Sequence, residues 1–213
     1  DPFTSCNTFR IGLSDDAEFG LFPPLLTRLR EEAPGIIVVV RRANYLLMPS
    51  LLASGEISVG ISYTTDLPAN AKRKKLRDIG VKVLRGDKRP NPLTLDEYCE
   101  RRHTMVSFSG DLSGNIDLDL AKVGRTRSVV VAVPQFSSLR ALLVGTELIA
   151  TVPDYAACAL VEGCGLRAED PPFHIEPAEL SMVWSGVHDN DPAERWLRAR
   201  IVEFMAQETR PIP

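Results

Sequence analysis

Small polar and aromatic side chains follow several apolar runs of this sequence, in positions where they could bind a solute. The candidates are Ser14, Asp15, Asp16, Tyr63, Ser107, Phe108, Ser109, Pro134, Gln135, Phe136 and Ser137. Hydroxyl and amide groups donate and accept hydrogen bonds, and aromatic rings supply apolar walls. This combination predicts the recognition of a small molecule by reversible contacts.

Most candidate segments also have an ordinary structural explanation, which the sequence leaves open. Residues 14–16 suit a helix cap, residues 107–110 suit a surface turn, and Tyr63 suits core packing. The adjacent carboxylates of Asp15 and Asp16 weaken the case for an anionic ligand at that segment. They favour a neutral or cationic group there.

Signals for catalysis or for bound metal are weak. The sequence contains no G-x-S-x-G elbow, Walker loop or H-E-x-x-H motif. Asp15 and Asp16 could do acid/base work, but adjacent side chains at a helix cap point apart. His103, His174 and His188 are scattered without metal-ligand spacing, so we expect structural histidines. We therefore expect no enzyme activity, no cofactor and no metal.

The candidate side chains need a scaffold that brings strand ends together. The first third of the chain reads as strand 7–13, helix up to Pro34-Gly35, strand 36–40, short helix 49–54 and strand 57–61. The continuous, mostly β-branched run 36–40 predicts a strand covered on both faces. This β-α-β-α-β order predicts a parallel sheet, and such open sheets bind ligands at the carboxyl ends of their strands.

The second half repeats this organisation after two polar breaks, at 64–77 and 87–92. Predicted strands cover 81–84, 104–107, 128–133, 148–152 and 180–184, and an amphipathic last helix opens at Asp191-Pro192. We therefore expect an α/β protein of two similar halves, with a boundary near residue 85. The basic run Lys72–Lys75 is expected in a solvated loop, with a surface that faces DNA as the alternative.

Composition restricts the class of protein further. The chain has 213 residues, 44% hydrophobic and 25% charged, with a formal net charge of -3, which argues against disorder and against direct nucleic-acid binding. No apolar run approaches the length of a membrane span, and no secretory signal is visible, although a mature protein can have lost one. The four cysteines include no C-x-x-C pair and suggest reduced thiols in a cytoplasmic protein; a redox pair of Cys158 and Cys164 is the alternative.

The order and spacing of several segments resemble one known family over residues 8–205. These segments are 22–29, 33–36, 52–57, 92–98, 133–136, 144–153 and 188–198. Together they are similar to the effector-binding domain of bacterial LysR-type transcriptional regulators, in the branch that includes nodulation regulators. The sequence departs from the family at Ser58, where an acidic residue is usual, and it lacks the family's N-terminal winged helix-turn-helix.

The resemblance implies a two-lobed fold of the type 2 periplasmic-binding-protein kind. Lobe I would comprise 1–84 with 186–213 and lobe II 85–185, with 81–84 and 180–184 as crossover strands. It implies a small-molecule effector held between the lobes, with residues 134–137 at the cleft. It also implies a homodimer or homotetramer that contacts DNA only through the missing domain. An exported solute-binding protein of similar fold is the alternative.

Overall fold

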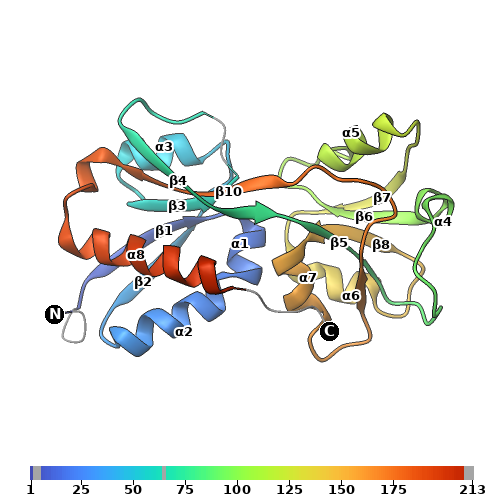
Figure 1. The fold of residues 1–213 in the computed structure, drawn as a ribbon, viewed down its shortest axis with the longest axis horizontal. Coiled ribbons are helices and arrows are strands. Elements are labelled where there is room, and N and C mark those ends of the chain that lie inside the picture. The colour runs from blue at the N-terminus through green and yellow to red at the C-terminus, as the bar shows by residue number, and fades with distance from the viewer. Residues whose placement is uncertain (2–5, 64–65, 209–213) are drawn as a thin grey trace. The chain divides into compact units, whose positions relative to one another are not determined.

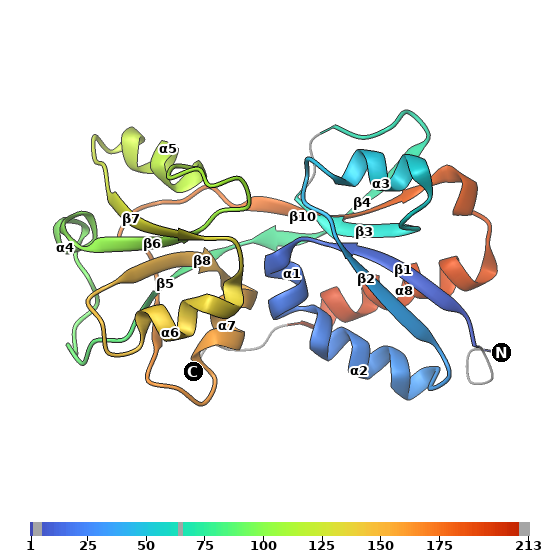
Figure 2. The same ribbon diagram turned by 180° about the vertical axis from the view of Figure 1, so that it is seen from behind.

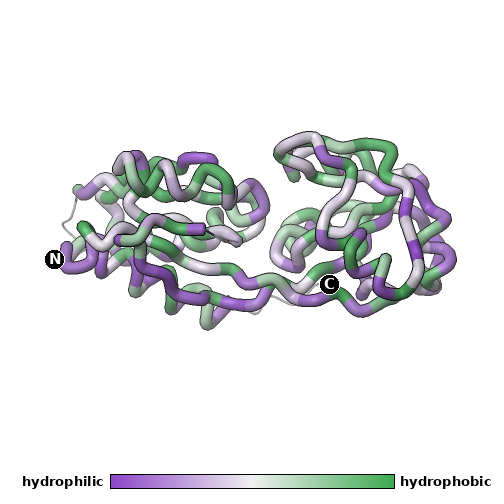
Figure 3. The backbone as a smooth tube through the Cα atoms, turned by 90° about the horizontal axis from the view of Figure 1, so that it is seen from above, coloured by the Kyte–Doolittle hydropathy of each residue, from purple (hydrophilic) through white to green (hydrophobic). Residues whose placement is uncertain are grey.

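The computed structural model describes residue 1 and residues 6–63 and 66–208. The chain divides into two compact units: unit 1 contains Asp1–Asp78 and the returning segment that begins at Ala178, and unit 2 contains Ile79–Pro177 (Figure 1). Figure 3 shows long hydrophobic segments, in green, within both units. Each unit therefore has its own apolar interior and its own β-sheet.

Unit 1 is built on a five-stranded sheet of order β2-β1-β3-β10-β4. Its strands are β1 (Thr8–Leu13), β2 (Ile37–Arg42), β3 (Val59–Ser62), β4 (Ala71–Ile79) and β10 (Ala178–Ser185). Its helices are α1 (Asp15–Gly20), α2 (Phe22–Glu32), α3 (Met48–Ser54) and α8 (Pro192–Gln207). β1 pairs in parallel with both β2 and β3, while β10 pairs antiparallel with β3. The predicted parallel β-α-β-α-β arrangement is confirmed.

The helices of unit 1 cover its sheet on two sides. Figures 1 and 2 show α3 across the strands from α2 and α8, which pack against each other. The apolar spacing of α2 explains its orientation, because Leu25 and Leu29 lie one turn apart and both are buried. On the other side, Met48 and Leu52 of α3 form a buried cluster with Ile57.

One strand of unit 1 differs from the expectation. The run 36–40 predicted a strand covered on both faces, but β2 lies at the edge of the sheet, and Ile37 is 55% exposed. Val38, Val39 and Val40 are only half-buried. β-Branched residues favour strands at the centre and at the edge alike, so this run does not report the position of its strand in the sheet.

Unit 2 repeats the plan with a sheet of order β7-β6-β8-β5-β9. Its strands are β5 (Val81–Arg85), β6 (Arg102–Val106), β7 (Ser128–Val133), β8 (Ile149–Pro153) and β9 (Arg167–Glu169). Its helices are α4 (Leu95–Glu100), α5 (Asn115–Lys122), α6 (Leu139–Leu143) and α7 (Asp154–Val161). β6 runs parallel to β7 and β8, whereas β5 is antiparallel to β8 and β9. Tyr98, Leu120 and Ile149 form its core with Val83 and Leu93.

The boundaries between the units lie earlier in the chain than the expected 84/85 and 185/186. The chain enters unit 2 at Ile79 and returns to unit 1 at Ala178. The reason is strand pairing, because β5 pairs with β8 and β9 of unit 2, whereas β10 pairs with β3 of unit 1. The segments 81–84 and 180–184, which were predicted as crossover strands, lie in β5 and β10. The chain passes from one unit to the other just before each of these strands.

The first polar break contains a strand that the sequence analysis did not predict. β4 includes the basic run Lys72–Lys75, which is exposed as expected but lies on an edge strand instead of a loop. Its four consecutive basic residues hide the alternation of apolar and polar side chains that identifies a strand. Thr64 and Thr65, in the same break, lie outside the described residues. No helix in the described part of the chain is long and apolar enough to cross a membrane.

Candidate functional site

The carboxyl ends of β1 and β3 bring two candidate segments together in unit 1. Leu13 is paired with Ile61, and the Ser14 N–H donates to the Ile61 carbonyl oxygen at 3.5 Å. Residues 14–16 therefore lie beside the end of β3 and Tyr63. This is the edge at which open α/β sheets bind their ligands.

Ser14 stands at the N-cap position of α1, yet its side chain makes no cap hydrogen bond. Only 9% of the residue is exposed, and its Oγ atom has no hydrogen-bond partner among the described residues. A buried hydroxyl left in this state costs about 1–3 kcal/mol. The simple helix-cap explanation therefore does not account for this side chain.

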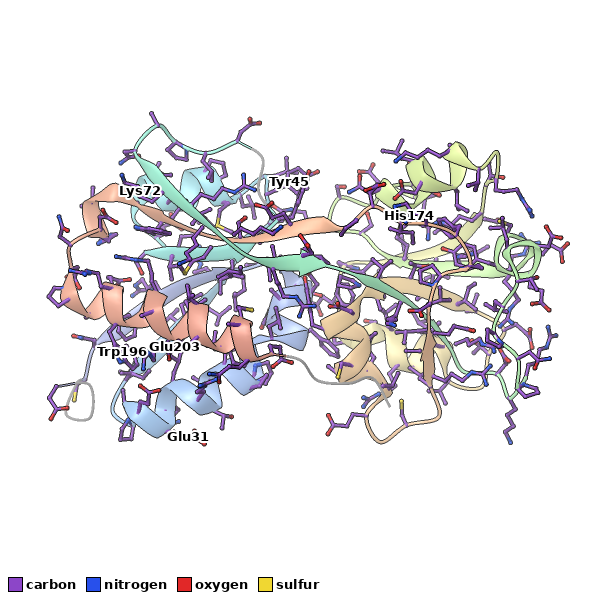
Figure 4. All side chains as sticks on the ribbon, in the orientation of Figure 1. Glu31, Tyr45, Lys72, His174, Trp196 and Glu203 are labelled. Atoms are coloured by element: carbon purple, nitrogen blue, oxygen red, sulfur yellow. The ribbon has the colours of Figure 1, made fainter. Side chains whose placement is uncertain are left out.

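Two tyrosines project beside this edge. Tyr63 is 41% exposed, so it does not serve as a core residue, and its ring packs edge-on against Tyr45 with centroids 6.2 Å apart. Tyr45 is 46% exposed and follows β2, the other parallel neighbour of β1 (Figure 4). Tyr45 was not among the predicted contacts, because β2 extends to Arg42, two residues beyond the apolar run 36–40.

Charge at the unit 1 edge is mixed. The half-buried Asp15 lies 4.0 Å from Arg42, the last residue of β2, and Asp16 is also half-buried. The partial neutralisation of Asp15 by Arg42 reduces the negative potential that two adjacent aspartates would otherwise create. That this edge favours a neutral or cationic ligand group stays a prediction.

The carboxyl ends of β6 and β7 form the corresponding edge of unit 2. These strands are parallel neighbours, and the Ser107 N–H donates to the Val133 carbonyl oxygen at 2.9 Å. Residues 107–109 therefore lie next to Pro134 and Gln135. Phe108 is 48% exposed, and the Ser109 hydroxyl donates to the Asp111 carboxylate at 2.7 Å.

The segment 134–137 differs in part from its expected roles. Pro134, Gln135 and Ser137 are exposed, but Phe136 is only 7% exposed and packs inside unit 2 instead of presenting an apolar wall. Phe136 opens a 3-10 helix that precedes α6, and this turn directs its ring inward. Ser137 does not cap α6; its hydroxyl contacts Gln135 Oε1 at 3.4 Å.

Each of the three histidines contacts neighbouring groups of the protein. His103 is fully buried, with Nε2 2.7 Å from the Tyr98 carbonyl oxygen, so Nε2 carries the proton. Burial lowers the pKa of His103 to about 4. His174 is exposed and pairs with Glu176, and the His188 carbonyl accepts from Arg198. The described residues contain no cluster of three or more potential metal ligands.

No disulfide joins any of the four cysteines, all of which lie among the described residues. Cys164 lies 3.0 Å from the Leu160 carbonyl oxygen and is half-buried, as is Cys158. No disulfide therefore joins Cys158 and Cys164 in this structure.

Unit 2 also contains a buried group of ion pairs away from the candidate edge. Arg85 is fully buried and pairs with Asp87 at 3.0 Å and with Glu169 at 2.5 Å, while Arg101 reaches Asp87 at 3.0 Å. Burial alone would raise the pKa of Asp87, but the hydrogen bonds from Arg89 and Arg101 and the nearby charges lower it overall. Arg85 also donates to the carbonyl oxygens of Arg89 and Asn91, so this group of ion pairs holds the loop that follows β5.

A family model described as the LysR substrate binding domain matches residues 4–206. The chain is 29% identical to the HTH-type transcriptional activator NahR of Pseudomonas putida, over 93% of this chain and 67% of that protein. It is 30% identical to nodulation protein D 1 of Rhizobium tropici, over 95% of this chain and 67% of that protein. The crystal structure of the regulatory domain of MexT, a transcriptional activator in Pseudomonas aeruginosa, matches with 68% identity and a TM-score of 0.88, over 92% of this chain and 99% of that one.

Proposed function

Because the chain belongs to the LysR substrate-binding-domain family and is the effector-binding domain of a LysR-type transcriptional regulator, we propose that it binds its effector at the carboxyl ends of the parallel strands. Its fold is of the type 2 periplasmic-binding-protein kind. The regulatory domain of MexT, which matches over 92% of this chain, comes from a transcriptional activator, and this argues against an exported solute-binding protein.

Each unit contributes its own set of contacts in this proposal. Unit 1 supplies Ser14, Asp15, Asp16 and Tyr63, to which we add Tyr45. Unit 2 supplies Ser107, Phe108, Ser109, Pro134, Gln135 and Ser137. Phe136 supports the last segment from inside the unit.

The observation that carries the proposal is the buried Ser14 hydroxyl without a partner among the described residues. Natural proteins leave few such groups, and those that persist often have a functional reason. A ligand atom that hydrogen-bonds this hydroxyl would remove its desolvation cost and gain affinity from it. Tyr45 and Tyr63 add exposed aromatic surface beside it.

The regulatory mechanism that we propose is a population shift. The effector favours one conformation of the domain, changes subunit packing and thereby changes the spacing of attached DNA-binding domains. A coupling free energy of about 1–3 kcal/mol is enough for a measurable switch. Two features support it: NahR, of which the match covers 67%, is a longer transcriptional activator, and the half-exposed edge strand β2 is suited to association in a homodimer or homotetramer.

We also propose that the domain is not an enzyme and acts in the cytoplasm. The relative NahR is named as a transcriptional activator, and the sequence carries none of the common catalytic motifs. Free cysteines suit a reducing compartment.

The proposal is tested by a thermal-shift screen of aromatic and aliphatic acids and of their neutral analogues. We expect at least one compound to raise the melting temperature, and Ser14→Ala to weaken its binding about five- to tenfold, the loss of one hydrogen bond. Ser50→Ala is the matched control, because Ser50 is exposed on α3 and bonds only its own helix turn. A screen without a binder, together with a strictly monomeric domain at high concentration, would count against the proposal.

A further inference from the structure

Unit 1 contains a cavity that the proposed effector contacts do not include. Its volume is about 330 Å³, and it is lined by Asp1, Asn7, Phe9, Ala33, Ile36, Pro192, Ala193 and Trp196. Apart from Asp1, these residues lie at or next to the start of β1, the end of α2 and the start of α8. The cavity therefore lies at the amino end of β1, whereas the effector edge lies at its carboxyl end; Figure 4 shows Trp196 and Tyr45 at opposite ends of unit 1.

The walls of this cavity favour a flat apolar molecule. Six of its eight lining residues are apolar, and the Phe9 and Trp196 rings are stacked with centroids 6.0 Å apart at an angle of 27°. Offset aromatic contacts stabilise by about 0.5–1.5 kcal/mol beyond burial. A volume of about 330 Å³ is at the small end of the range of ligand pockets, roughly 300–1,000 Å³. One or two fused rings match both the volume and the walls.

The charges beside the cavity disfavour an anion. The start of α8 would otherwise offer free N–H groups, but the Asp191 carboxylate already accepts from the N–H groups of Ala193 and Glu194 at 2.9 and 3.0 Å. Pro192, the first residue of the helix, has no N–H to donate. A ligand carboxylate placed here would therefore meet the Asp191 charge and lack these donors.

From these observations we infer that this cavity is a second ligand site, specific for a neutral aromatic molecule of one or two rings. Trp196 and Phe9 provide the stacking surface, and Ala33 and Ala193 leave the space that the ring occupies. The site is separate from the proposed effector edge. Its occupancy does not depend on Ser14.

The test uses indole as the probe and fluorine NMR of the 5-fluorotryptophan-labelled domain. The chain has two tryptophans, so two signals are expected, and Trp184→Phe assigns them. Indole should shift the Trp196 signal saturably in the millimolar range or tighter. The Trp184 signal should stay in place, because its Nε1 bonds Asp189 and Arg198 stacks over its ring at 4.9 Å.

Two alanines of α8 give matched variants. Ala193→Leu fills the cavity and should weaken indole binding about tenfold or more, which is 1.4 kcal/mol. Ala199→Leu makes the same change at an exposed position of the helix and should bind indole like the parent. Ser14→Ala should also bind indole normally, so failure of the effector proposal leaves this result unchanged.

Several outcomes would overturn the inference. One is a Trp196 signal that does not respond to about 5 mM indole, well above a millimolar Kd. Another is equal indole binding by Ala193→Leu and the parent. Tighter binding of indole-3-acetate than of indole would contradict the assigned ligand class. A Trp196 signal that changes with protein concentration instead of indole would show that a second copy of the chain covers the cavity.

Discussion

The buried Ser14 hydroxyl should lower the free energy of unfolding of the ligand-free domain. Because this buried group has no partner among the described residues, Ser14→Ala should raise the free energy of unfolding of the ligand-free domain by about 1 kcal/mol. Urea denaturation of the variant and the parent measures the difference, and Ser50→Ala is the control. A loss of stability in Ser14→Ala would mean that the hydroxyl is satisfied in solution.

His103 makes the stability of unit 2 depend on pH. Its pKa is about 4 in the folded protein, against 6.5 when exposed, because burial disfavours the charged ring. The unfolded chain therefore binds more protons between these values. The contribution of neutral His103 is complete above pH 6.5, and about 3 kcal/mol of it is lost as pH falls to 4.

The pH prediction is measured by urea denaturation at several values between pH 4 and pH 7. His103→Gln should show a shallower loss of stability over this window than the parent. His174→Gln, which changes an exposed histidine, should follow the parent. Parallel curves for the parent and His103→Gln would contradict the assignment.

At the residue scale, sequence reasoning located strand-end segments better than it assigned side-chain roles. The segments 14–16 and 107–109 lie where the strand-end rule placed them. The 3-10 turn that follows β7 directs Phe136 inward. Neither the residue type of Phe136 nor its neighbours in the sequence indicate this turn. Tyr45 was missed because the strand before it extends to Arg42, two residues beyond the apolar run. Whether these residues bind an effector stays a prediction.

Among the elements, β5 and β9 depend on the buried ion pairs of Arg85. Arg85→Met would leave Glu169 without its ion-pair partner and Asp87 with Arg101 alone, and should cost about 3–5 kcal/mol of stability. Arg89→Met is the control, because the Arg89 side chain is 60% exposed and its nearest carboxylate is 4.0 Å away. Equal denaturation midpoints for the two variants would show that the buried pairs do not hold these strands.

Elements with an apolar pattern could be predicted, including the edge strands β2 and β7, whereas the edge strands β4 and β9 could not. The spacing of Leu25 and Leu29 in α2 and the apolar run of β3 predict buried positions, and these positions are buried. β4 carries Lys72–Lys75 on exposed positions, and β9 has three residues, so neither leaves an apolar pattern. The pairing of β10 with β3, which moves the unit boundary, depends on contacts far apart in the sequence.

At the scale of the whole molecule, the acidic balance of the chain predicts weak contact with DNA. The net charge is -3, and affinity for DNA comes largely from neutralising phosphates. Fluorescence anisotropy with a labelled duplex at low salt should therefore show no saturable binding by this domain. Lys72–Lys75 is the exposed basic run to test, and salt-sensitive binding lost on its replacement by glutamine would contradict the prediction.

Effector binding at the carboxyl ends of the parallel strands can be observed along the whole chain. Hydrogen exchange, measured with and without a compound from the thermal-shift screen, tests this most directly. We expect slower exchange at residues 14–16 and around Tyr45 in unit 1, and at 107–109 and 135–137 in unit 2. Slower exchange confined to other segments, with these unchanged at saturating compound, would contradict it.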